Sequence, residues 1–138
     1  MTEQKLILVV DDNICNLEMI REFLLHTGYR VATAQDGLEA ITKTRSLHPD
    51  LILMDVQMPV MDGLKATRWL KSQEEFKRIP VIAITALELP EDKKRCLEAG
   101  ADVYVSKPMS LLRLSSSLQT WLKIGKPVGS LCMKLLGC

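Results

Sequence analysis

The sequence predicts an α/β fold in which a parallel sheet carries helices on both faces. Short apolar runs of strand length alternate with longer segments whose apolar residues recur at helical spacing, and this happens five times along the chain. Such alternation is typical of βαβ units, in which each crossover helix returns the chain to the same edge of the sheet. The 138 residues suffice for one domain with a sizeable core.

The first half of the chain predicts three strands and two helices. A buried strand over residues 5–10 leads into Asp11, Asp12 and Asn13, where either Asp12 or Asn13 can cap a helix that ends at Gly28. A second strand over residues 29–34 turns at residues 35–37 into a second helix. Residues 51–55 form a third, fully buried strand that ends at Asp55. The inward-facing helix positions are Leu17, Ile20, Leu24, Ala40, Ile41, Thr44 and Leu47.

The second half continues the alternation. A helix over about residues 64–73 precedes a buried strand over residues 81–85, and a helix from Pro90 to Ala99 is closed by Gly100. A fifth strand covers residues 102–106 and precedes the last helix. The inward positions of these helices are Leu64, Thr67, Leu70, Leu111, Leu114, Leu118 and Trp121.

Candidate site residues follow four of the five predicted strands. They are Asp11 and Asp12 after the first strand, Asp55 at the end of the third, Thr85 at the end of the fourth and Lys107 after the fifth. The second strand leads into the turn at residues 35–37 and contributes no such residue, which favours an edge position. We therefore predict a doubly wound five-stranded sheet in the flavodoxin-like order 2-1-3-4-5. Because the carboxyl ends of parallel strands share one edge, these side chains converge on one site.

Composition excludes several classes of function. Eighteen basic and seventeen acidic residues leave a net charge of +1, so no basic excess supports direct binding of nucleic acid. No apolar run approaches the ~20 residues that span a bilayer, and no secretory signal is evident, so we predict no membrane association and a cytoplasmic location. The four cysteines lack metal-ligand spacing and are predicted to be reduced thiols. His26 and His48 are predicted to lie on the surface.

The predicted site suits phosphoryl transfer to a carboxylate. Three converging carboxylates repel one another, and a hard divalent cation such as Mg²⁺ relieves this repulsion. Lys107 adds a mobile positive charge, and Thr85 adds a hydroxyl donor. Positioning and charge neutralisation supply most of the catalysis in such a transfer. Taken singly, the same residues could be a helix cap, a strand residue and a surface charge.

Four motifs resemble the receiver domains of bacterial two-component response regulators. They are Val9-Val-Asp-Asp12, Leu53-Met-Asp-Val-Gln-Met-Pro59 with Met61-Asp-Gly63, Ile84-Thr-Ala86 and Val105-Ser-Lys-Pro108. The resemblance covers residues 5 to about 124. The run from Asp12 to Asn16 is similar to receivers attached to hybrid sensor kinases.

The resemblance implies a role for each site residue. Asp55 would be the phosphoacceptor, and Asp11, Asp12, Asp55 and the backbone carbonyl of Gln57 would hold Mg²⁺. Thr85 and Lys107 would bind the phosphoryl group. Tyr104 would respond to the state of Thr85, and the peptide bond between Lys107 and Pro108 would be cis.

Two other classes compete with this interpretation. A phosphatase of the haloacid-dehalogenase type needs a second Asp two residues beyond its nucleophile, where this chain has Gln57. A flavodoxin that binds FMN needs a neutral phosphate loop, where this chain has Asp11 and Asp12. A pseudo-receiver serving as a scaffold is a third possibility, although the acceptor, the acidic pair and Lys107 are all present.

We therefore expect a phosphorylation-dependent switch that takes its phosphoryl group from a sensor histidine kinase or a histidine phosphotransfer protein. It would act on a downstream protein partner, as a monomer or weak dimer, and would catalyse only its own phosphorylation and dephosphorylation. Residues 1–124 would form the receiver domain, and residues 125–138 a short tail of unknown role.

Overall fold

The structure, a computed structural model, describes residues 4–56, 62–85, 90–106 and 111–124. Helices and strands alternate as predicted, and their bounds differ from the predicted ones by one residue at several ends. The elements are β1 (Leu6–Val10), α1 (Ile14–Thr27), β2 (Arg30–Ala34), α2 (Gly37–Leu47), β3 (Leu51–Asp55), α3 (Gly63–Ser72), β4 (Val81–Thr85), α4 (Pro90–Glu98), β5 (Val103–Ser106) and α5 (Leu111–Ile124).

The five strands form one parallel sheet in the order β2-β1-β3-β4-β5, which confirms the predicted order. β1 lies near the centre, with β2 on one side and β3 on the other. Asp55 at the end of β3 lies opposite Ile84 in β4, one residue before Thr85. The polar residues at these strand ends therefore face the same edge of the sheet.

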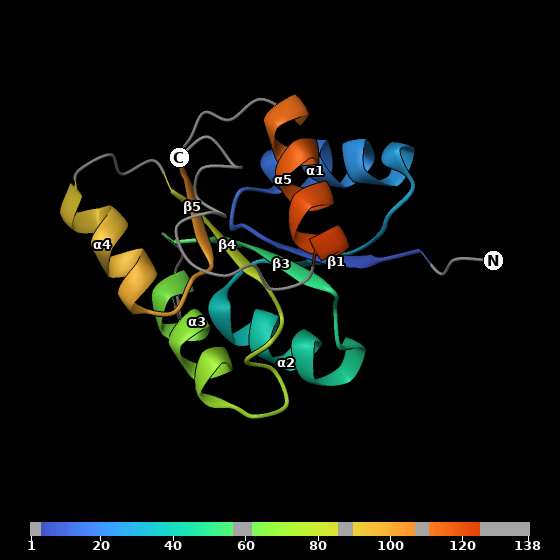
Figure 1. Cartoon of the computed structure of the whole chain (residues 1–138). Coiled ribbons are helices and arrows are strands. Elements are labelled where there is room, and N and C mark those ends of the chain that lie inside the picture. Colours follow the sequence, from blue (N-terminus) through green and yellow to red (C-terminus); the bar gives the residue numbers. More distant parts are fainter. Residues whose placement is uncertain (1–3, 57–61, 86–89, 107–110, 125–138) are drawn as a thin grey trace.

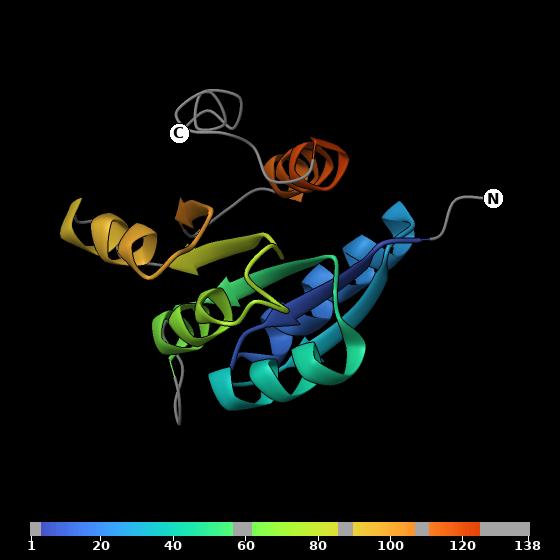
Figure 2. The ribbon, with the colours of Figure 1, turned by 60° about the horizontal axis from the view of Figure 1, so that its bottom comes forward.

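Helices cover both faces of the sheet (Figure 1). α1 and α5 pack on one face, where they bury Ile7 and Val9 of β1, whereas Leu8 and Val10 face α2 and α3 on the other. Figure 2 shows α5 on the opposite side of the sheet from α2 and α3. Side chains alternate between the two faces along each strand, and helices bury the apolar side chains on both faces.

One predicted core position is wrong. Leu47 is 46% exposed, although the helical spacing placed it on the buried face of α2. It is the last residue of α2, and the chain turns directly after it at His48, which has a φ of 49°. The other predicted inward positions whose side chains the structure describes are buried: Leu17, Ile20, Leu24, Ala40, Ile41, Thr44, Leu64, Thr67, Leu70, Leu114, Leu118 and Trp121.

Side-chain caps fix where three of the helices begin. Asn13 caps α1, which decides between the two candidates that the sequence left open, and Asp36 and Asp62 cap α2 and α3. Each side-chain oxygen accepts a hydrogen bond from the backbone N–H three residues on. Gly28 ends α1 in the left-handed conformation that glycine adopts without strain.

The structure also bears on the predicted cysteines, histidines and membrane segments. Cys15 is exposed and Cys96 is buried, and neither forms a disulfide bond. His26 and His48 lie on the surface, as predicted. Within the described ranges, no helix has the length and apolar character needed to cross a membrane. Gln57, Lys107, Pro108, Cys132, Cys138 and the whole of the predicted tail lie outside the described residues.

Candidate functional site

Three carboxylates gather at the carboxyl edge of the sheet. Asp11 and Asp12 directly follow β1, and Asp55 ends the neighbouring strand β3. One oxygen from each residue lies within 4.8 Å of the others. Asp11 and Asp55 are both 4% exposed, whereas Asp12 is open to solvent. The convergence predicted for these three residues is confirmed.

Asp11 is held by its own strand end and by the start of α1. Its backbone N–H donates to the carbonyl of Ala34 at 3.0 Å, which fixes the chain against β2. Its carboxylate accepts the backbone N–H of Asn13 at 2.9 Å and faces the side-chain amide of Asn16 at 3.5 Å. These donors orient the carboxylate.

Asp55 is held by the close approach of α3 to the end of β3. The N–H of Val56 donates to Ile84 in β4, and the N–H of Gly63 donates to the carbonyl of Val56, each at 3.0 Å. A Cβ atom at Gly63 would lie 2.1 Å from the backbone oxygen of Asp55. Only glycine at this position lets the helix lie so near the strand, and Thr67 donates to the carbonyl of Gly63 at 2.7 Å.

The structure describes only part of the remaining predicted site residues. Thr85 ends β4 beside β3, and its backbone lies opposite Ser106 in β5. Tyr104 is half-buried in β5 and packs against a cluster that includes Val56, Leu64 and Ala83. The side chain of Thr85 and all of Gln57 and Lys107 lie outside the described residues, so their predicted roles stay predictions.

Two supporting residues were not predicted as part of the site. Asn16 lies beside Asp11, whereas in the sequence the run from Asp12 to Asn16 indicated only a receiver subtype. Gly63 was one residue of a quoted motif, but its contact with the backbone of Asp55 emerges only in three dimensions. A polar residue one helical turn beyond an acidic pair was the available signal for Asn16.

The arrangement suits a hard cation bound by oxygen. Octahedral Mg²⁺ has bonds of about 2.0–2.1 Å, so two ligands on opposite sides of the ion are about 4.2 Å apart. The three carboxylates therefore need only small adjustments to share one ion. Three ionised carboxylates would more than offset the double positive charge of the ion and would leave coordination positions for water or phosphate oxygens.

The family of the chain follows from comparison with known proteins. The model of the response regulator receiver domain matches residues 7–119. The chain belongs to this family. Membership decides against the phosphatase and flavodoxin alternatives, because the match spans β1 to the middle of α5. The chain is a receiver domain of two-component signalling.

Curated relatives agree with this assignment. The polar-differentiation response regulator DivK of Brucella ovis is 41% identical over 118 residues, covering 86% of this chain and 96% of the relative. DivK of Brucella anthropi is 39% identical over the same length. These relatives are response regulators nearly as long as the aligned region.

Solved structures include receivers that belong to histidine kinases. The signal receiver domain of a histidine kinase from Syntrophus aciditrophicus has a TM-score of 0.83 at 39% identity, covering 91% of this chain and 96% of that one. The receiver domain of a sensor histidine kinase from Pseudomonas aeruginosa has a TM-score of 0.82 at 40% identity, covering 88% and 99%. In that receiver a magnesium ion is coordinated in the active-site cleft.

Proposed function

We propose that Asp55 is the phosphoacceptor of this receiver domain. The observation that carries the proposal is the cluster of Asp11, Asp12 and Asp55, in which a nearly buried carboxylate at the end of a central strand lies within 4.8 Å of two others. The backbone at Asp55 is held in place by the close approach of Gly63 and by the neighbouring strand. A nucleophile on a fixed backbone reduces the entropic cost of reaching the transition state.

Asp11 and Asp12 would hold Mg²⁺ together with Asp55 and the backbone carbonyl of Gln57. Support comes from the acidic cluster and from the magnesium in the Pseudomonas receiver. When bound, the ion would neutralise charge on the phosphoryl oxygens. The donors from Asn13 and Asn16 keep Asp11 oriented toward this task.

The transfer itself exchanges one bond for another. An oxygen of Asp55 forms a bond to phosphorus as the P–N bond of a phosphohistidine breaks, and the electron pair of that bond stays on the imidazole nitrogen. Hydrolysis reverses the modification, since water attacks phosphorus, the Asp55 oxygen leaves as carboxylate, and inorganic phosphate is released. In both steps the domain acts only on its own modification and consumes no metabolite.

Thr85 and Lys107 would bind the transferred group. Thr85 lies at the end of β4, next to the strand that ends in Asp55, and we expect its hydroxyl to donate to a phosphoryl oxygen. Lys107 follows β5 directly and would add a positive charge. Phosphorylation would draw Thr85 toward the phosphoryl group, and Tyr104 would fill the space that Thr85 leaves. These movements would alter the surface formed by α4, β5 and α5.

The partners follow from the family. Receiver domains interact with histidine kinases and with downstream proteins, and the donor for this chain would be a kinase or a histidine phosphotransfer protein. Residues 1–124 would form the domain, with residues 125–138 as a tail of unknown role, and the protein would act in the cytoplasm. We expect no direct contact with nucleic acid, and a monomer or weak dimer.

Incubation with acetyl phosphate and Mg²⁺ should add one phosphoryl group to the protein. Intact mass spectrometry should show a single adduct that hydroxylamine removes, because an acyl phosphate is attacked by that nucleophile. Omitting Mg²⁺ should abolish most of the adduct. A protein that stays unmodified while folded would support the pseudo-receiver alternative and refute the proposed function.

Mg²⁺ should bind weakly and should require the acidic pair. A hydrated ion held by few carboxylates keeps much of its water shell, so its affinity is low. Amide shifts near Asp55 should respond to Mg²⁺ in the wild type and stay silent in the double variant Asp11→Ala, Asp12→Ala. The variant Glu74→Ala, which removes an exposed carboxylate far from the site in sequence, is the control. Unchanged affinity in the double variant would rule out this metal site.

A further inference from the structure

β2 is one of the two edge strands of the sheet, so among the residues that the structure describes, one row of its backbone groups has no strand partner. The pairing with β1 identifies that row. Arg30 donates its N–H to Lys5, and the carbonyl of Ala34 accepts from Asp11, so residues 30 and 34 face β1. In a parallel pair alternate residues bond to the same neighbour. The backbone groups of Val31, Thr33 and Gln35 therefore point away from the sheet.

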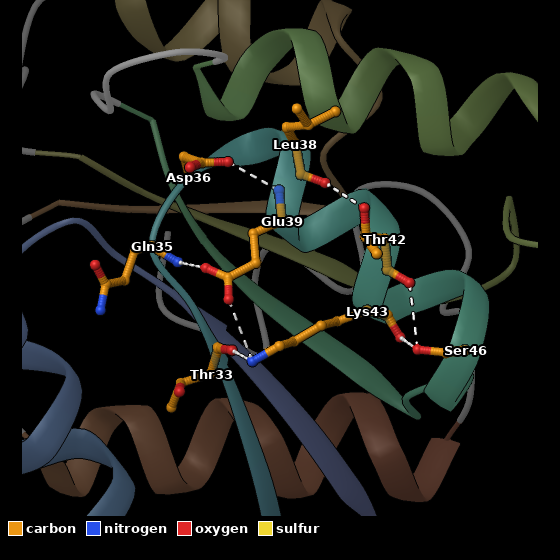
Figure 3. A network of polar contacts seen from close by, with 8 residues as sticks. All are labelled: Thr33, Gln35, Asp36, Leu38, Glu39, Thr42, Lys43 and Ser46. Carbon is orange, nitrogen blue, oxygen red and sulfur yellow. Dashed lines mark hydrogen bonds and ion pairs between the residues drawn. The ribbon is translucent and has the colours of Figure 1, made fainter.

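Two side chains of α2 bond to this outward row (Figure 3). The Nζ atom of Lys43 donates to the carbonyl of Thr33. A carboxylate oxygen of Glu39 accepts the N–H of Gln35 at 2.7 Å. Glu39 and Lys43 also pair with each other at 3.4 Å, one helical turn apart. The ammonium donor of Lys43 thus meets a carbonyl acceptor, and the carboxylate acceptor of Glu39 meets an N–H donor.

The pattern is that of one residue of a further parallel strand. In a parallel ladder, a residue opposite Ala34 would donate its N–H to the carbonyl of residue 33 and accept the N–H of residue 35. Lys43 supplies that donor, and Glu39 supplies that acceptor. Uncovered edge strands pair readily with other chains, and proteins often block them with lysine.

We propose that Glu39 and Lys43 close the β2 edge by taking the place of one residue of a sixth strand, and that this contact keeps a second copy of the chain from pairing there. A second copy is the occupant that fits, because an identical strand related by a two-fold axis presents the same row of groups in antiparallel pairing. The proposal is independent of phosphorylation and of the metal site.

The charge-swapped variant Glu39→Lys, Lys43→Glu separates this role from that of an ordinary helix ion pair. The swap keeps an ion pair and the net charge, but it sets a donor against the N–H of Gln35 and an acceptor against the carbonyl of Thr33. The rate of hydrogen exchange at the backbone amide of Gln35 should rise about tenfold or more, because the carboxylate of Glu39 no longer accepts its hydrogen bond. Sedimentation velocity should show a dimer whose fraction rises with protein concentration.

Two further variants keep the test decisive. The matched swap Lys94→Glu, Glu98→Lys reverses an exposed i,i+4 pair on α4 and should stay like the wild type. Adding Thr33→Pro to the Glu39/Lys43 swap should abolish the dimer, because it removes an outward N–H from the edge. If the swap does not fold, Glu39→Ala with Lys43→Ala removes the same contacts without reversing charges. A folded Glu39/Lys43 variant that sediments as a monomer at every concentration, or whose dimer survives Thr33→Pro, would overturn the proposal.

Discussion

The substitution Gly63→Ala should destabilise the domain by more than about 3 kcal/mol, beyond the usual cost of overpacking. The added methyl group would lie 2.1 Å from the backbone oxygen of Asp55 and 2.9 Å from Cγ of Met54. The first of these neighbours is backbone, so no side-chain rotation relieves the collision. α3 must move away from β3, and the hydrogen bond from Gly63 to Val56 is lost with it.

Urea unfolding measures this effect, and Gly28→Ala is the matched control. Gly28 has a φ of +107° and no atom within 4 Å of an added Cβ, so alanine there meets conformational strain but no collision. We expect that control to lose about 1–2 kcal/mol. Since Gly63 touches Asp55, the proposed phosphoacceptor, any folded Gly63→Ala protein should also be phosphorylated more slowly. A variant with wild-type stability would show that α3 does not hold Asp55 in this way.

The substitution Lys71→Met should cost about 3–5 kcal/mol, the range for breaking a buried ion pair. The Nζ atom of Lys71 donates to the carboxylate of Asp102 at 2.7 Å and to the carbonyls of Ile79 and Lys77 at 2.8 and 3.1 Å. Asp102 also accepts the N–H of Val81 at 2.9 Å. This network ties the end of α3 to the starts of β4 and β5.

Methionine keeps the packing of the lysine chain but leaves Asp102 buried without its cation. The side chains of Lys71 and Asp102 are only 12% and 6% exposed, so water cannot replace the lost partner. The control is Lys77→Met, because Lys77 pairs with Glu74 on the surface and should change stability by less than about 1 kcal/mol. Adding Asp102→Asn to Lys71→Met should recover part of the loss. Equal stabilities for the two Lys→Met variants would contradict this account of the network.

The fold could be predicted because its signals are local. Each strand is a short apolar run, each helix an amphipathic segment, and the absence of a candidate site residue after β2 indicated its edge position. Leu47 was misplaced because the helical spacing alone does not reveal that the helix ends there. The network of Lys71 and Asp102 was not predictable, since the two residues are 31 positions apart and belong to no motif.

The site was predictable for a different reason. Parallel strands bring their carboxyl ends to one edge, so Asp11, Asp12 and Asp55 had to converge once the strand order was correct. What the sequence does not contain is the means by which they are held. The closeness of α3 to Asp55, and the donors that orient Asp11, depend on distances between elements that no local pattern encodes.

Mapping the modified residue shows directly whether Asp55 is the phosphoacceptor. After incubation with acetyl phosphate and Mg²⁺, borohydride reduction of the acyl phosphate and peptide mass spectrometry identify the carboxylate that carried the phosphoryl group. We expect one trapped site, at Asp55, and none in the variant Asp55→Asn. Trapping at Asp11, Asp12 or another carboxylate of the wild type, or an equal yield in Asp55→Asn, would contradict it.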